Sequence, residues 1–240
     1  MMHSQHIDQC TSFIHCHMGA PARPGSYVDA RSRRSGITIS RQSGCGAHAV
    51  AERVAARLQA ECPEDAPPWT IYDRNLVEKV LEEHQLPGHI ARHMPEDRIH
   101  SFDDIMDQLF GLHPPLDTLV QQITETILHL AERGHVILVG RGAHLVTATM
   151  PRFLHVRLVG SVAQRIRHMQ QFEGLDNRAA MERIQREDRG RERYLRTYFG
   201  KNIEDPSLYH LVLNTDLVSV DETADLIVSL ARPRLKQAAV

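Results

Sequence analysis

The chain has 240 residues, with 28 basic and 30 acidic side chains and a formal net charge of -2 at pH 7. This balance argues against a protein that holds nucleic acid or an anionic membrane through bulk charge. Apolar residues make up 42% of the chain, enough for one substantial core, and no apolar run approaches the roughly 20 residues of a membrane helix. Four scattered cysteines favour the reducing cytoplasm over a disulfide scaffold.

Residues 1–35 are poor in Leu, Ile, Val and Phe, and we expect a mobile tail there. Its cysteines and histidines match no standard zinc spacing. Order is expected from Gly36, where the β-branched run 37–39 predicts a strand. A glycine-rich segment, 40–46, follows, and the helical spacing of apolar residues predicts a helix over 49–58. The chain therefore begins its core with a strand, a glycine loop and a helix.

Further along, strands and helices are expected to alternate. Unbroken or alternating apolar runs predict strands at 69–72, 135–139, 153–159 and 211–213. Helical spacing predicts helices at 75–86, 116–133, 161–173, 176–198 and 219–231. The proline-rich stretch 87–115 interrupts this pattern, as in an insertion over a core. The alternation predicts an α/β fold with a five-stranded parallel sheet covered by helices on both faces.

Ligands of such sheets bind beyond the carboxyl ends of the strands, where this chain places the glycine loop, Asp73-Arg74, Gly140-Arg141 and 214–216. A glycine loop before a helix offers backbone N–H groups and the positive end of the helix dipole to an anion. This loop lacks the usual phosphate-binding Lys, because Ala47 stands at that position. A purely structural turn is the alternative interpretation.

Arginine could supply the missing positive charge. The chain has 25 Arg and only 3 Lys, and six of the arginines fall between Arg183 and Arg196. Helical spacing predicts that Arg186, Arg189 and Arg193 share one face. An Arg-rich lid over a glycine loop suits phosphoryl transfer, which needs chiefly positioning and charge neutralisation. The alternative is an exposed helix laced with Arg/Glu pairs.

Several motifs, taken in order, resemble the cytidylate kinase-like family of P-loop nucleoside monophosphate kinases. They are 39–46, 72–74, 139–143, 187–191 and 214–215. The resemblance implies a three-layer P-loop NTPase-type fold, ATP with Mg²⁺ as the phosphate donor, and a small nucleotide such as CMP or dCMP as the acceptor. It also implies a kinase domain over 36–232, with a helical acceptor-binding insertion at about 87–115, an Arg-rich lid at about 174–200 and a C-terminal tail over 233–240.

The resemblance also implies roles for individual residues. Donor binding falls to Arg41, Ser43, Gly44, Cys45, Gly46, Ala47, His48, Asn214 and Thr215. Acceptor binding falls to Asp73, Arg74 and Arg141, and catalysis to Arg165, Arg186, Asp188 and Arg191. No protein ligand to a resident metal is predicted. Asp73 has a second interpretation, as the cap of the helix that follows it.

Three departures from the family pattern leave other functions open. Ala47 replaces the loop Lys, His48 and Ala49 leave no hydroxyl at the usual Mg²⁺ position, and Gly142 replaces the Asp of a Gly-Arg-Asp element. A nucleotide-binding pseudokinase or a kinase for another small molecule is therefore an alternative to a cytidylate kinase. Cys45, at a helix N-terminus, is either a thiol of lowered pKa or an inert loop residue.

Overall fold

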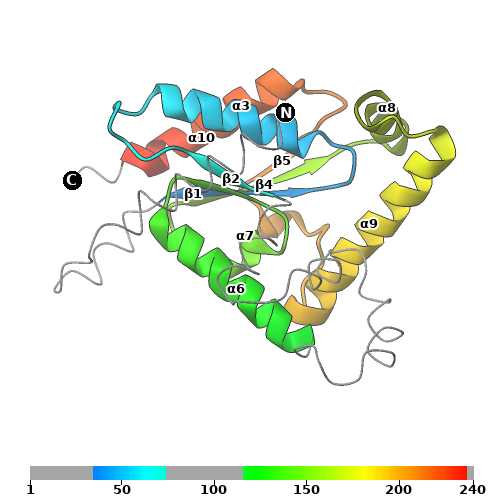
Figure 1. Cartoon of the computed structure of the whole chain (residues 1–240), viewed down its shortest axis with the longest axis horizontal. Coiled ribbons are helices and arrows are strands. Elements are labelled where there is room, and N and C mark those ends of the chain that lie inside the picture. The colour runs from blue at the N-terminus through cyan, green and yellow to red at the C-terminus, as the bar shows by residue number, and fades with distance from the viewer. Residues whose placement is uncertain (1–34, 74–115, 237–240) are drawn as a thin grey trace.

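The computed structural model describes residues 35–73 and 116–236 (Figure 1). The predictions for the first 34 residues, for Arg74, for the helix over 75–86 and for the insertion over 87–115 lie outside the described residues.

The described strands form one parallel sheet in the order β2-β3-β1-β4-β5. The strands are β1 (Gly36–Arg41), β2 (Thr70–Tyr72), β3 (Val136–Val139), β4 (Phe153–Val159) and β5 (Leu211–Asn214). β1 lies at the centre, where Ile37 pairs with Ile137 of β3 on one side and with Leu154 of β4 on the other. This confirms the predicted five-stranded parallel sheet, and it places the glycine loop at the carboxyl end of the central strand.

Helices cover both faces of the sheet (Figure 1). One face carries α3 (Ala47–Ala60) and α10 (Val220–Lys236), which pack against each other. The opposite face carries α6 (Leu116–Arg133) and the single turn α7 (Ala143–Val146). The remaining helices are α8 (Val162–Glu173), α9 (Asn177–Phe199) and the 3₁₀ turn η2 (Pro206–Leu208). The predicted three-layer α/β fold is therefore confirmed.

The main core lies between the sheet and the α3/α10 layer. Val50, Val54 and Leu58 of α3 are almost fully buried against Ile37 and Ile39 of β1. Their spacing of four residues puts them on one side of the helix, as the sequence predicted. This packing fixes the N-terminus of α3, and with it the glycine loop, above the end of β1.

The structure departs from the predicted elements at three places. α7 and η2 are too short to show a periodic pattern in the sequence. The last helix was predicted to end at residue 231, before Pro233, but α10 continues to Lys236. Proline removes one N–H donor near a helix end, and one remaining turn tolerates that loss. Residues 233–236, assigned to a tail from sequence, are therefore helical.

Candidate functional site

The glycine loop turns sharply between β1 and α3. Gly44 and Gly46 adopt φ values of 83° and 68°, a left-handed conformation that disfavours side chains. A Cβ at Gly44 would lie 2.7 Å from the carbonyl oxygen of Arg165. Gly44 is thus required by both conformation and packing, because α8 presses directly against the loop.

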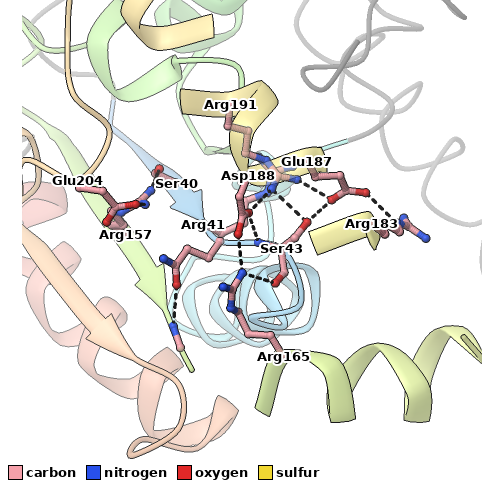
Figure 2. A network of polar contacts seen from close by, with 12 residues as sticks. Ser40, Arg41, Ser43, Arg157, Arg165, Arg183, Glu187, Asp188, Arg191 and Glu204 are labelled. Carbon is pink, nitrogen blue, oxygen red and sulfur yellow. Dashed lines mark hydrogen bonds and ion pairs between the residues drawn. The ribbon is translucent and has the colours of Figure 1, made fainter. Parts of the chain in front are cut away.

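Arg165 and Asp188 tie helices α8 and α9 to this loop (Figure 2). Arg165 of α8 is 6% exposed, and its Nη1 donates to the carbonyl oxygen of Ser43 at 3.1 Å. The same Nη1 donates to Asp188 Oδ2 of α9 at 2.5 Å, and Asp188 Oδ1 accepts from the backbone N–H of Ser43 at 2.8 Å. These residues, predicted as catalytic or donor-binding, are brought together.

Glu187 and Arg191 add a second set of contacts to Ser43. The Ser43 hydroxyl donates to Glu187, and Arg191 Nη1 donates to Ser43 Oγ at 3.1 Å. Arg191 also bonds Glu187 Oε2 at 3.0 Å and Asp188 Oδ1 at 3.1 Å, while Arg183 Nε bonds Glu187 Oε1 at 2.7 Å. Two carboxylates of α9 thus occupy hydrogen-bonding groups that a glycine loop otherwise offers to an anion.

The ionised form of Glu187 is strongly favoured in this cluster. Burial by itself would raise its pKa, but the hydrogen bonds from Ser43 and Arg183 and the charges of Arg191 and Arg183 outweigh burial. Together they lower the pKa of Glu187 to about 2. Sequence reasoning missed Glu187 and Arg183 as site residues, although Arg183, Glu187 and Arg191 follow one another at steps of four and so share one helical face.

Arg41, Asp73 and His48 meet on the other side of the loop. Arg41 Nη2 lies 3.5 Å from Asp73 Oδ1, and His48 Nδ1 lies 3.6 Å from Asp73 Oδ2. The carboxylate at the end of β2 therefore faces the glycine loop, as predicted from the strand ends. Arg74 and the helix that Asp73 was predicted to cap lie outside the described residues.

Arg141 and Gly142 form a tight turn after β3. Gly140, Arg141 and Gly142 have φ values of 84°, 55° and 67°, so three successive residues have positive φ. A Cβ at Gly142 would lie 3.0 Å from Cε2 and 3.2 Å from Cζ of Phe199. The space beside this turn is occupied by the aromatic end of α9, where Phe199 packs edge-on against Tyr194.

Asn214 and Thr215 lie beside the loop at the edge of the sheet. Thr215 Oγ1 donates to the Val159 carbonyl at 3.2 Å, and Asn214 Oδ1 accepts from the N–H of Asp216 at 3.0 Å. Thr215 also hydrogen-bonds Cys45, but burial outweighs that bond and raises the pKa of the Cys45 thiol. The lowered thiol pKa considered from sequence is therefore wrong, and the inert interpretation fits.

A cavity of about 250 Å³ opens over the glycine loop. Its lining includes the whole loop from Arg41 to His48, together with Asp73, Arg141 and Arg191. Arg165 and Asp188 line an adjoining cavity of about 230 Å³. Arg186 lines neither cavity and is exposed, because it lies a quarter turn away from the Arg183, Glu187 and Arg191 side of α9. The face predicted from Arg186, Arg189 and Arg193 is therefore not the one turned to the loop.

Two further residues of the first cavity escaped sequence reasoning. His168 and Glu173 of α8 line it, and burial lowers the pKa of His168. Neither stands in a recognisable motif, so only the packing of α8 on the loop reveals them. Among the residues 35–73 and 116–236, no three His, Cys, Asp or Glu side chains form a metal-binding group, and no helix is long and apolar enough to cross a membrane.

Comparison with known proteins identifies relatives over most of the chain. Residues 36–217 match the cytidylate kinase-like family. A cytidylate kinase of Aeropyrum pernix is 29% identical over 68% of this chain and 92% of its own length, and one of Methanopyrus kandleri is 29% identical over 70% and 89%. An uncharacterized protein of Eubacterium ventriosum shares the fold with a TM-score of 0.60 at 18% identity, over 83% of this chain and 99% of that one. The glycine loop on the central strand and the arginines that converge on it fit this family. Its match over residues 36–217, which include all five described strands, shows that the chain belongs to the cytidylate kinase-like family.

Proposed function

We propose that the chain is a nucleoside monophosphate kinase that transfers the γ-phosphoryl group of ATP to CMP, dCMP or a related pyrimidine nucleotide. The supporting observation is the convergence of Arg165 and Arg191, from two different helices, on Ser43 of the glycine loop. Guanidinium groups in this position neutralise the charge that spreads over a transferring phosphoryl group. The names of the matched relatives support the choice of acceptor.

Each part of the site has a role in this proposal. The backbone of residues 43–48 holds the donor phosphates at the N-terminus of α3. Arg141, which lines the cavity over the loop, holds the acceptor nucleotide. Asp188 accepts from Arg165 and Arg191 at 2.5 and 3.1 Å, so it holds both guanidinium groups in register over the loop.

ATP-dependent kinases use Mg²⁺, and the donor set here fits a metal held mainly by nucleotide. The carboxylates of Asp73 and Glu187 line the loop cavity, and Mg²⁺ is commonly bound by one or two carboxylates together with substrate phosphates and water. Of the two, Asp73 would hold the metal, because Glu187 is already bound by Arg183 at 2.7 Å and by Arg191 at 3.0 Å. When bound, it would neutralise phosphate charge and hold the phosphates in position.

Turnover of a substrate panel tests the proposal. Purified protein with ATP and MgCl₂ is offered CMP, dCMP, UMP, AMP and GMP in separate reactions, and nucleoside diphosphates are quantified by chromatography. We expect CDP or dCDP above the ATP hydrolysis background. Arg178→Gln, on an exposed position of α9, should retain that activity, whereas Arg191→Gln should lose it by about a hundredfold or more. Absence of diphosphate from every acceptor contradicts the kinase assignment.

Ala47 and Gly142 favour one alternative, a nucleotide-binding pseudokinase. Both replace polar residues of the family pattern, at the phosphate loop and at the acceptor turn. This alternative requires ATP binding by calorimetry without turnover on any acceptor. Formation of a phosphorylated product from a different small hydroxylated acceptor would instead identify a kinase for another substrate.

A further inference from the structure

Arg157 is a buried arginine that the proposed reaction does not use. It lies in the middle of β4 and its side chain is 3% exposed. A charged side chain in a covered strand is costly to desolvate unless its donors are paired. Sequence reasoning gave it no role, because a single Arg within an apolar strand carries no motif.

The partners of Arg157 leave it incompletely satisfied. Its Nη1 donates to Ser40 Oγ at 3.0 Å and its Nη2 to Glu204 Oε1 at 2.5 Å (Figure 2). The guanidinium also lies 5.7 Å from the centre of the Tyr209 ring. Its Nε has no hydrogen-bond partner among the described residues. Glu204 has a side chain that is 57% exposed, so the only acidic partner found for this buried cation among residues 35–73 and 116–236 is a surface side chain.

Arg157 lines the cavity of about 230 Å³ that adjoins the glycine loop. The lining holds five arginines and three carboxylates: Arg41, Arg157, Arg165, Arg189, Arg191, Asp188, Glu192 and Glu204. Arg165, another buried guanidinium of this lining, also has an Nε without a partner among the described residues. Positive charge thus exceeds negative charge around a space bordered by two unsatisfied buried N–H donors.

The size and position of this cavity restrict its ligand. Its volume is below the roughly 300 to 1,000 Å³ of whole small-molecule sites, so it suits one compact group. Arg41 and Arg191 line both this cavity and the one over the loop. The group therefore binds next to the donor phosphates while leaving the loop available.

We propose that Arg157, Arg165 and Arg189 form a second anion subsite, which binds a phosphoryl group beside the glycine loop. The phosphoryl group comes either from the acceptor nucleotide or from free phosphate. Arg157 and Arg165 supply buried donors, and Arg189 supplies an exposed charge at the entrance. Direct phosphate binding tests the subsite independently of turnover, so its failure is distinguishable from failure of the proposed kinase reaction.

Nuclear magnetic resonance of arginine side chains gives a residue-specific test. The Nε–H signal of Arg157 in the full chain is assigned by its loss in Arg157→Lys, and inorganic phosphate is then titrated into the wild-type protein. We expect a saturable shift of this signal. An unmoved signal, while the backbone N–H of Ser43 and Gly44 shifts, would assign phosphate to the loop alone and overturn the subsite. No shift at either position overturns it as well.

Variants of α9 check that the shift reports binding. Arg189→Gln leaves the core untouched because Arg189 is exposed. It should raise the phosphate dissociation constant measured at Arg157 about tenfold, as for the loss of one charge-assisted contact. Arg178→Gln, an exposed position on the same helix that lines neither cavity, is the matched control and should leave it unchanged. Equal affinity in both variants contradicts the subsite.

A competition arm identifies the source of the phosphoryl group. CMP is added at saturation before the phosphate titration. If CMP itself shifts the Arg157 signal and abolishes the phosphate response, the subsite holds the acceptor phosphate. If the phosphate response persists with CMP bound, the subsite takes a separate free anion.

Discussion

Replacing Glu187 by Gln should tighten nucleotide binding, because the ionised carboxylate competes for the phosphate-binding groups of the loop. Glu187 bonds the Ser43 hydroxyl, Arg183 and Arg191, and its side chain is only 17% exposed. Its pKa falls from 4.5 to about 2. At about 1.4 kcal/mol per pKa unit, the ionised contacts stabilise this arrangement by about 3 kcal/mol.

A bound phosphate must displace these Glu187 contacts. The free energy of binding is therefore less favourable by part of the energy that the contacts supply. The Gln amide still accepts a hydrogen bond but carries no charge, and we expect it to recover about half of the cost. Glu187→Gln should then bind ATP about tenfold more tightly, which corresponds to about 1.4 kcal/mol. It should also lower the free energy of unfolding at pH 7.

Isothermal titration with ATP, with and without MgCl₂, measures the effect. Glu182→Gln is the matched control, because Glu182 lies on the same helix with a side chain that is 62% exposed. Weaker ATP binding by Glu187→Gln would mean that the carboxylate helps to bind the nucleotide or its metal. Unchanged binding would mean that breaking the Glu187 contacts costs no free energy. Either result refutes the competition.

The stabilisation by Glu187 also has a defined pH dependence. Since the pKa is lowered in the folded state, the stabilisation is complete above about pH 4.5. It should be lost as the pH falls from there towards 2, and urea unfolding of wild type and Glu187→Gln should converge over that interval.

Further predictions concern packing, pH and acceptor binding. Gly44→Ala should lower the melting temperature more than Gly200→Ala, because both glycines have positive φ but only a Cβ at Gly44 meets a neighbour within 4 Å; equal losses would contradict the clash. Burial and two neighbouring histidines lower the pKa of His155 to about 3, so its unfolded form binds a proton first and stability should fall as the pH drops from 6.5 towards 3. Urea unfolding of His155→Asn should show a shallower fall. Arg141→Gln should weaken CMP binding about tenfold while ATP binding is unchanged, and unaltered CMP affinity in calorimetry would remove Arg141 from the acceptor site.

The sheet was predictable because its strands carry strong apolar runs. Residues 136–139 and 153–159 are buried almost throughout, so the sequence pattern and the structure agree there. Helix α9 was predictable in extent, to within one residue at each end, but not in orientation. The rotation of α9 about its own axis depends on which of its carboxylates reach Ser43. Composition alone does not tell whether Arg186 or Arg183 faces the glycine loop. Arg157 shows the same limit, because its partners lie 47 and 117 residues away in the chain.

In the proposed function the turn at Gly142 belongs to the acceptor site, and its packing restricts which residue position 142 can carry. Restoring the Asp of the family's Gly-Arg-Asp element would place a Cβ 3.0 Å from the Phe199 ring, in a backbone conformation of φ 67°. Asp at position 142 therefore requires either a shift of the Phe199 ring by a few tenths of an ångström or a smaller residue at 199. We therefore expect substitutions at 142 and 199 to be coupled, so that single substitutions at either position do not report the effect of the pair. Paired libraries of 142 and 199 are the appropriate starting point for engineering acceptor recognition.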